Sequence, residues 1–294
     1  MSKSILLYGD SGDGKSTLIG EFAEHVFKTT GKRTRLCSAD RGGTESVKPY
    51  IDLGIIELVL FDDSDPWVWL NSVVQGKIKK DGKWILGAND NIGFYAFESL
   101  TSIGDELMLS LAKKAASGAN IGGGASVSFK VNDSGENLSI SGNNQSHYGV
   151  VQSQITEKVW QSQKLPGWVA WTAAVKRDDD PNSVGKVLGP AVAGKALTGE
   201  LPRWFTYCFR VAATPGSAGQ AEKHILHMGD HSEAGSKGLG NTRVPLDAPK
   251  IPSTVEPASL VKAIKLIEDS YAPSLEAIKK RLGDSLKPGL KTGA

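Results

Sequence analysis

Residues 9–17, with the sequence GDSGDGKST, are well suited to binding phosphate. Glycines at positions 9, 12 and 14 let the chain curl so that its N–H groups point toward phosphate oxygens. We expect Lys15 to reach the β- and γ-phosphates and the Ser16 hydroxyl to ligate Mg²⁺. The sequence therefore predicts a nucleoside triphosphate site formed by consecutive residues, which are Gly9, Asp10, Ser11, Gly12, Asp13, Gly14, Lys15, Ser16 and Thr17.

The segments on either side of this loop have the pattern that a phosphate-binding loop requires. Residues 5–8 are apolar or aromatic and predict a buried strand, and Leu18, Phe22 and Val26 follow with helical spacing. A helix that begins at the loop adds partial positive charge where phosphates would bind. A glycine-rich turn before an ordinary helix is the plainer interpretation, but the order strand, loop, helix favours a P-loop.

A P-loop needs a second acidic group on a neighbouring strand to complete the Mg²⁺ shell. Glu98 directly follows the apolar run 92–97 and meets this requirement. The alternative is that Glu98 only caps a helix that starts near residues 99–101. We interpret Ser16 and Glu98 as the metal-binding pair.

Hydrolysis also needs a group that orients the attacking water. Asp40, just after a predicted strand, is the preferred candidate, and Glu45 is the second. The acidic run 62–65 is more simply a helix cap. Thr172 either senses the γ-phosphate or is a β-branched core residue. The carboxyl ends of parallel strands face one crevice, so all these positions are compatible with a single site.

A late glycine-rich loop, residues 235–243, carries two cations. Lys237 and Arg243 could bring positive charge to a phosphate, within one chain or across a subunit interface. A solvated loop is the alternative. The catalytic residues predicted from the sequence are therefore Lys15, Asp40, Glu98, Lys237 and Arg243.

Composition restricts the class of protein. The chain has 294 residues, 39% of them hydrophobic, and a formal charge of +2, so no global field attracts nucleic acid or membrane. Cys37 and Cys208 lie apart in apolar runs, which indicates free buried thiols in a reducing compartment. No apolar run is long enough for a signal peptide or a membrane span. We expect a cytoplasmic protein without a membrane partner.

Strand and helix patterns alternate along the chain, which predicts an α/β fold with a mostly parallel central sheet flanked by helices. The apolar run 54–61 is expected to be a strand covered on both faces. Residues 223–228 are expected to form the last strand, followed by loops over residues 229–256. A helical stretch over 258–286 is expected to break near Pro273. We predict a P-loop ATPase domain over residues 1–250 and a helical C-terminal appendage with a tail over 251–294.

Residues 117–149 differ from the rest in being rich in Gly, Ser and Asn. Alternating apolar residues on either side of Asp133-Ser134-Gly135 predict an inserted β-hairpin. Lys130 and the neighbouring aromatic residues could hold single-stranded nucleic acid. A hairpin without a ligand is the alternative. A second small hairpin or loop is expected around Asp81-Gly82.

The order of these motifs over about residues 3–247 resembles that of the small RecA-like ATPases encoded by tailed phages, some of which act as single-strand annealing recombinases. The resemblance rests on GDSGDGKST, SAD, DDSDPW, FYAFESLTS, LPGWVAWTAAV and GSKGLGNTRVP. It implies a RecA-like P-loop NTPase fold, ATP with Mg²⁺, self-assembly into rings or filaments, and single-stranded DNA as partner. By position, Lys15 and Ser16 match the P-loop, Glu98 the strand-end acid, Asp40 the acid after the second strand, and Lys237 and Arg243 a late basic pair.

Two departures from the family pattern concern hydrolysis. The family usually has Asp at the position of Glu98, and often has His where this chain has Ala174. The resemblance implies an ATP-binding, ATP-hydrolysing protein that acts on single-stranded DNA in recombination or replication in the host cytoplasm. The alternatives are an oligomeric motor or assembly ATPase, such as a DNA-packaging ATPase, and a nucleotide switch with low turnover.

Overall fold

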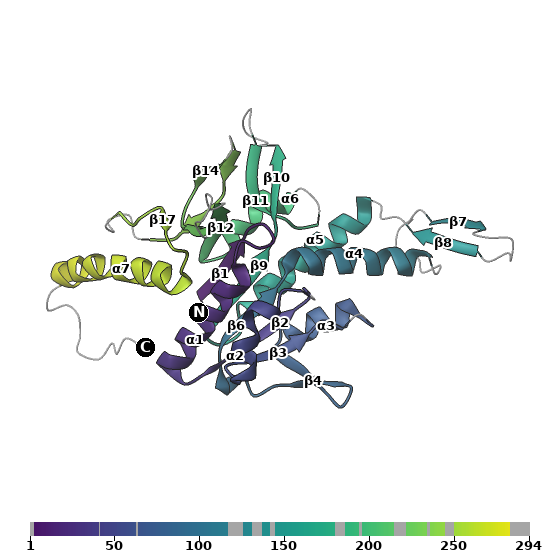
Figure 1. Ribbon diagram of the computed structural model, residues 1–294, viewed down its shortest axis with the longest axis horizontal. Coiled ribbons are helices and arrows are strands. Elements are labelled where there is room, and N and C mark those ends of the chain that lie inside the picture. The colour runs from purple at the N-terminus through teal and green to yellow at the C-terminus, as the bar shows by residue number, and fades with distance from the viewer. Residues whose placement is uncertain are drawn as a thin grey trace.

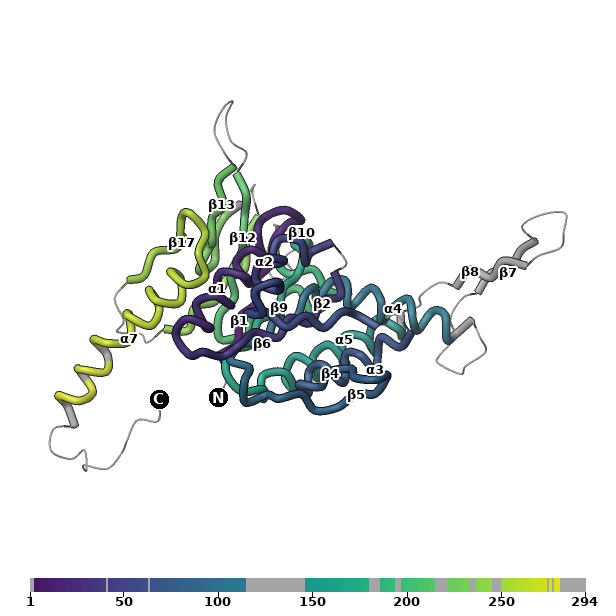
Figure 2. Tube along the Cα trace, turned by 60° about the horizontal axis from the view of Figure 1, so that its bottom comes forward, coloured from purple at the N-terminus to yellow at the C-terminus, as the bar shows by residue number. Residues whose placement is uncertain are grey.

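The computed structural model describes residues 3–40, 42–62, 64–116, 126–130, 137–141, 145–179, 186–193, 196–214, 222–233, 236–244 and 250–282. In these ranges, helices lie on both sides of one large sheet (Figure 1). Figure 2 shows helix α7 (Leu260–Leu282) extending from one end of this body and α4 (Leu100–Ala116) toward the other. None of the helices described is both long and apolar enough to cross a lipid bilayer.

The main sheet contains nine strands within the described residues. Six of them run parallel in the order β12-β1-β9-β6-β2-β3. They are β1 (Lys3–Tyr8), β2 (Arg33–Ser38), β3 (Ile56–Leu60), β6 (Ile92–Glu98), β9 (Trp168–Ala173) and β12 (Tyr207–Thr214). Three antiparallel strands lie beyond β1 on the β12 side: β13 (Lys223–His227), β16 (Asn241–Thr242) and β17 (Thr254–Val255). The predicted α/β class with a mostly parallel sheet is confirmed.

Alternation along β1 produces the two hydrophobic layers. Ile5 and Leu7 are buried toward one side of the sheet, and Leu6 and Tyr8 toward the other, because successive side chains of a strand point to opposite faces. Helices α1 (Lys15–Thr30), α2 (Lys48–Asp52) and α7 cover the first side, and α3 (Pro66–Val73), α4 and α5 (Gln145–Ser162) cover the second. Short 3₁₀ and α-helical turns connect these elements at Glu45–Val47, Asn89–Asn91, Ala196–Glu200 and Leu201–Trp204.

A second sheet of four strands corrects two of the predictions. Its order is β10-β11-β15-β14, and its strands are β10 (Val175–Asp179), β11 (Lys186–Pro190), β14 (His231–Glu233) and β15 (Ser236–Gly238). Loops are expected over residues 229–256, where β14 to β17 lie. These strands are short and several contain charged residues. They therefore lack the alternation of apolar and polar side chains on which strand prediction depends. Residues 223–228 are therefore not the last strand.

Two further predictions are wrong in detail. The run 54–61 forms β3, but β3 is the terminal strand of the main sheet, so Leu60 is 61% exposed instead of covered. Helix α7 continues through Pro273 without a break. A proline removes one hydrogen bond and crowds the preceding turn, but here the helix on either side of it is maintained.

The two predicted hairpins are confirmed. Strands β4 (Lys77–Lys80) and β5 (Lys83–Leu86) pair on either side of Asp81 and Gly82. Strands β7 (Ser126–Lys130) and β8 (Asn137–Ser141) pair within the insertion. The rest of residues 117–144 lies outside the described part of the chain. The domain boundary at residue 250 remains a prediction.

Candidate functional site

The loop after β1 has the backbone of a phosphate cradle. Gly12 and Gly14 have φ values of 88° and 92°, in the left-handed region that glycine tolerates best. Helix α1 begins directly afterwards, and its first intrahelical bond runs from Leu18 N–H to the Gly14 carbonyl at 3.0 Å. The N–H groups of the first helical turn have no intrahelical acceptor. They are therefore available to an anion.

Lys15 lies inside this loop. Its ammonium donates hydrogen bonds to the carbonyl oxygens of Gly9 at 2.9 Å and of Asp10 at 2.7 Å. Burial lowers the pKa of Lys15, although the carboxylates of Asp13 and Glu98 oppose the shift. The predicted phosphate-binding cation is therefore positioned at the cradle and is held there by the loop's own backbone.

Asp13 has a structural role that the sequence did not reveal. Its side chain is buried and accepts hydrogen bonds from Arg210 at 2.7 Å, from Asp10 N–H at 2.6 Å and from Ala213 N–H at 3.2 Å. Burial raises the pKa of Asp13, while Arg210 and the backbone bonds lower it. Arg210 is itself buried on β12, so this ion pair fastens the P-loop to the neighbouring strand. The available signal was an arginine inside the apolar run 204–213.

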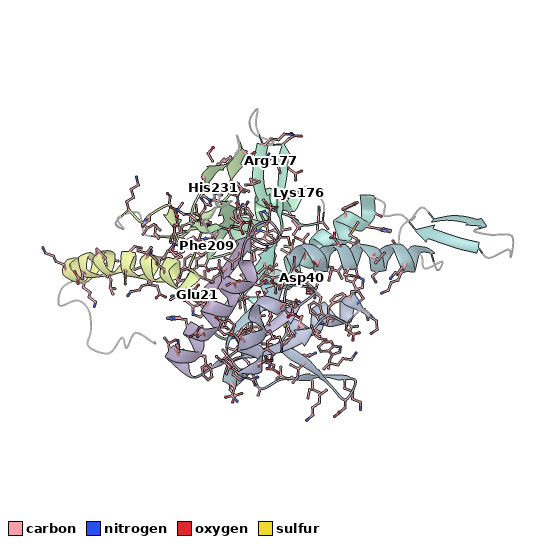
Figure 3. The ribbon with its side chains drawn as sticks, in the orientation of Figure 1. Glu21, Asp40, Lys176, Arg177, Phe209 and His231 are labelled. Atoms are coloured by element: carbon pink, nitrogen blue, oxygen red, sulfur yellow. The ribbon has the colours of Figure 1, made fainter. Side chains whose placement is uncertain are left out.

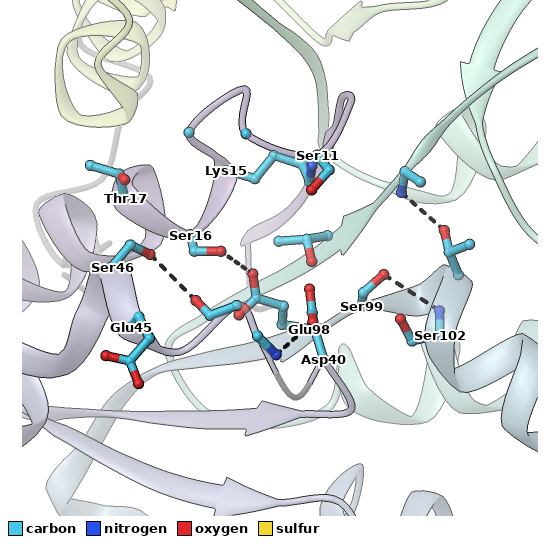
Figure 4. A pocket seen from close by; sticks show the side chains of 17 residues that line it. Ser11, Lys15, Ser16, Thr17, Asp40, Glu45, Ser46, Glu98, Ser99 and Ser102 are labelled. Carbon is cyan, nitrogen blue, oxygen red and sulfur yellow. Dashed lines mark hydrogen bonds between the residues drawn. The ribbon is translucent and has the colours of Figure 1, made fainter.

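A cavity of about 550 Å³ opens beside the P-loop, between α1, the segment after β2 and the end of β6 (Figure 4). Glu98 lies at its base, is only 2% exposed, and accepts a hydrogen bond from the Ser16 hydroxyl. Its second carboxylate oxygen, Oε2, is buried and has no hydrogen-bond partner in the part of the chain described. The two residues predicted to hold Mg²⁺ are thus in direct contact.

Asp40 lies beside Glu98 in the same cavity. A Cβ atom added to Gly43 would come within 3.0 Å of the Asp40 carboxylate and 3.3 Å of the Glu98 carboxyl carbon, so the chain passes closely over both acids. Burial raises the pKa of Glu98 to about 7, and the charge of Asp40 adds to the shift. The Ser16 hydrogen bond and the charge of Lys15 act in the opposite direction. Without a cation, the Glu98 carboxyl group therefore resists ionising.

Two other predicted residues also line this cavity, Glu45 and Thr172. Thr172 is fully buried on β9, and its hydroxyl has no hydrogen-bond partner in the described structure. Nearby, the Thr101 hydroxyl donates to the Ala191 carbonyl at 2.6 Å and accepts from Ala174 N–H at 2.9 Å. Thr101 thereby joins the start of α4 to the end of β9 and to the second sheet.

Lys237 and Arg243 are not among the residues that line the cavity. Lys237 lies on β15 and forms a 3.1 Å ion pair with Asp230. Arg243 donates to the carbonyl of Arg203. Figure 3 shows the second sheet, marked by Lys176 and Arg177, above Asp40 in the view. Within one chain, the late basic pair is therefore separate from the cluster formed by Lys15, Asp40 and Glu98.

A second cavity of about 480 Å³ adjoins the first and shares Gly12, Gly14 and Thr17 with it. Its wall combines apolar side chains of α1 and of the segment before α7, including Leu18 and Pro257. On its floor, His224 Nδ1 lies 2.9 Å from the Asp13 carbonyl. Together the two cavities form a continuous surface on either side of the P-loop.

The residues present fit a Mg²⁺–nucleotide complex. Magnesium prefers oxygen ligands, and Ser16 and Glu98 offer a hydroxyl and a carboxylate at one point. The unpartnered Glu98 and Thr172 oxygens are costly to bury unless a ligand, ion or water satisfies them. The glycine-rich backbone and Lys15 provide the complementary donors for phosphate.

Comparisons with known proteins add little to this geometry. No family model matches the chain, and no curated protein is similar to it. Among solved structures, a KaiC-like protein from the archaeon Pyrococcus horikoshii is 11% identical, and the flagellar accessory protein FlaH from Methanocaldococcus jannaschii is 9% identical. Each alignment covers 77% of both chains with a TM-score of 0.37, which is too low to support an argument. The predicted α/β class with a mostly parallel sheet rests on the observed strand order.

Proposed function

We propose that this protein is a Mg²⁺-dependent ATPase of the RecA-like class. The observation that carries the proposal is the contact between the Ser16 hydroxyl and the buried Glu98 carboxylate, beside the P-loop and within one cavity. A structural turn would not need a buried acid with an unpartnered oxygen at this position. A bound Mg²⁺ would neutralise charge on the phosphates during transfer.

The predicted functional residues of the cavity then have the following roles in binding and hydrolysis. The P-loop backbone and Lys15 hold the phosphates, and Ser16 and Glu98 hold the cation. Asp40 orients the attacking water, because its carboxylate lies next to Glu98. The Thr172 hydroxyl, also in the cavity, is placed to donate to the terminal phosphate or to this water. The nucleoside extends over Gly12 and Gly14 into the second cavity.

The assembly and the partner belong to the same proposal. Lys237 and Arg243 lie away from the cavity of their own chain, which suits delivery of charge to a neighbouring subunit in a ring or filament. The resemblance to phage RecA-like ATPases supports action on single-stranded DNA in recombination or replication.

Turnover of ATP with and without single-stranded DNA tests the proposal. We expect Mg²⁺-dependent hydrolysis that DNA stimulates, and salt-sensitive DNA binding. Absence of stimulation together with absence of salt-sensitive binding would contradict the DNA role. Sizing in ATP and in ADP tests assembly, and a strictly monomeric protein would exclude both rings and filaments.

A nucleotide switch with little turnover is the second candidate. It is favoured by the raised pKa of Glu98, which opposes the charged form that a metal ligand needs. It is also favoured by Ala174, directly after β9, where the side chain cannot contact the γ-phosphate. Comparison of wild type with Glu98→Gln separates the two candidates. A wild-type turnover well above that of the Glu98→Gln variant would exclude the nucleotide switch.

A further inference from the structure

We propose that the β4–β5 hairpin is the surface that binds the phosphate backbone of single-stranded nucleic acid. The inference rests on the nucleic-acid partner of the proposed function and assigns the part of the molecule that makes the contact. Residues 77–86 contain four lysines and one aspartate, a net charge of +3, against +2 for all 294 residues. The hairpin thus concentrates positive charge in an otherwise near-neutral protein.

Two of the four lysines face each other across the hairpin. Lys80 and Lys83 are directly opposite each other in the antiparallel register, and like charges at such positions are destabilising. Within the described structure, no carboxylate pairs with Lys77, Lys80 or Lys83, whereas Lys79 pairs with Asp62. An arrangement that costs free energy in isolation is favourable when an anion lies between the cations.

The root of the hairpin is fixed by a buried arginine. Arg35 on β2 is 1% exposed, and its guanidinium donates to the Gly76 carbonyl at 2.8 Å and to Asn89 Oδ1 at 2.9 Å. A Cβ atom on Gly87 would come within 2.6 Å of this guanidinium, so both ends of the hairpin close tightly around it. Asp81 and Gly82 have φ values of 50° and 74°, as in a tight two-residue turn. The lysines are therefore presented on a defined ribbon.

Apolar side chains alternate with these cations. Lys79 lies opposite Trp84, and Lys77 opposite Leu86. Leu86 is 68% exposed and Ile85 is 42% exposed, while the Trp84 ring is half-buried. Sequence-independent binding to single strands combines cations that follow the backbone with aromatic rings on which bases stack, and Trp84 is the aromatic residue of this hairpin. This combination favours nucleic acid over an acidic peptide, which would not use the apolar surface in the same way.

The hairpin is separate from the nucleotide cavity. It leads through Asn89–Asn91 into the amino end of β6, whereas Glu98 lies at the carboxyl end of the same strand. Figure 1 shows strand β4 at the bottom of the molecule. Charge changes on the hairpin should therefore leave ATP binding and the basal ATPase activity unchanged.

The test is a charge reversal on the full-length protein. The triple variant Lys77→Glu, Lys80→Glu, Lys83→Glu is compared with wild type by fluorescence anisotropy of labelled oligo-dT at several salt concentrations. We expect at least roughly tenfold weaker binding, and a salt slope smaller by about 2, since each phosphate contact to a single strand contributes about 0.7. The matched control is Lys262→Glu, Lys265→Glu, Lys280→Glu on exposed positions of α7, which makes the same change in net charge.

The outcomes separate this inference from the proposed function. If wild type binds oligo-dT and the hairpin variant binds it equally well, or if the α7 control loses as much affinity, the hairpin assignment is overturned while the DNA role stands. If wild type does not bind oligo-dT at low salt with either ATP or ADP present, the hairpin assignment and the DNA role of the proposed function are both wrong. If polyglutamate competes as well as DNA for wild type, the surface recognises acidic peptides and the inference is wrong. Unchanged basal ATPase activity in the variant shows that it is folded.

Discussion

At the scale of single residues, Lys15 is the most direct test of the phosphate cradle. We expect Lys15→Ala to lower ATP turnover by roughly 100-fold or more, because one positioned cation is removed from the developing charge. The free energy of unfolding should change by only about 1–2 kcal/mol, since the side chain is half-buried and its hydrogen bonds to Gly9 and Asp10 are partly buried and exposed, respectively. Steady-state kinetics and urea denaturation measure the two effects. Lys28→Ala, at an exposed end of α1, is the matched control.

Glu98 predicts a pH dependence of stability in the absence of ligand. The pKa of Glu98 is raised from 4.5 to about 7, so the folded state holds a proton that the unfolded state releases. Protonated Glu98 makes its full contribution to the free energy of unfolding below pH 4.5. This contribution, about 3 kcal/mol, is lost as the pH rises through 7. Urea denaturation at pH 4.5 and pH 7.5 should show a larger loss for wild type than for Glu98→Gln. Equal losses would contradict the burial of this acid in its protonated form.

The Asp13–Arg210 ion pair predicts strong coupling between two distant positions in the sequence. Arg210→Met should lower the free energy of unfolding by about 3–5 kcal/mol, because it leaves the buried Asp13 without its cation. The double variant Asp13→Asn, Arg210→Met should be less destabilised than the Arg210→Met variant, since no charge is then buried alone. A double-mutant cycle in urea measures this interaction. Additive effects would show that the pair does not fasten the P-loop to β12.

At the scale of elements, Thr101 connects the cavity to the second sheet. Thr101→Val keeps the shape of the side chain but leaves Ala174 N–H and the Ala191 carbonyl without their partner, which costs about 1–3 kcal/mol. We also expect lower ATP turnover, because Thr172 and Glu98 lie on the strands that meet at this point. Thr101→Ser should restore both properties. Thermal denaturation and kinetics of the two variants provide the measurement.

Some of these elements could be predicted from the sequence and others could not. β1, β6 and the P-loop were predictable because apolar runs and glycine spacing are local signals. Glu98 could be proposed from its place after a strand, and its contact with Ser16 agrees with that reasoning. The Asp13–Arg210 pair could not be predicted from the sequence, because the two residues are 197 positions apart and only folding brings them together. The strands of the second sheet were missed because they are short and several are charged.

At the scale of the whole molecule, the C-terminal segment packs against the main sheet and α1. Four large apolar residues beyond position 250 are buried: Val255, Leu260, Ile264 and Ile267. Glu21 on α1 also accepts a hydrogen bond from Leu260 N–H at 3.0 Å, at the junction with α7 (Figure 3). At about 2 kcal/mol each, the four side chains contribute roughly 8 kcal/mol, comparable with the total stability of a domain.

A chain that ends at residue 250 should therefore fail to fold, whereas a chain that ends at residue 282 should keep the thermal transition of the full-length protein. Circular dichroism on heating measures both. A cooperative transition in the shorter chain would support the domain boundary predicted at residue 250. Nucleotide binding by the longer chain is the control for the integrity of the cavity.

The two hydrogen bonds of Lys15 have a consequence for ligand selection. The carbonyl groups of the loop already accept hydrogen bonds from the Lys15 ammonium group. They therefore compete with any incoming anion for this group. A ligand gains affinity only by the difference between its own contacts and these two bonds. Inorganic phosphate or sulfate offers a single anionic group, whereas a triphosphate spans the cradle, the lysine and the acidic pair at once. Because of this competition, small anions, which are abundant in cells, should bind more weakly than the longer phosphate chain.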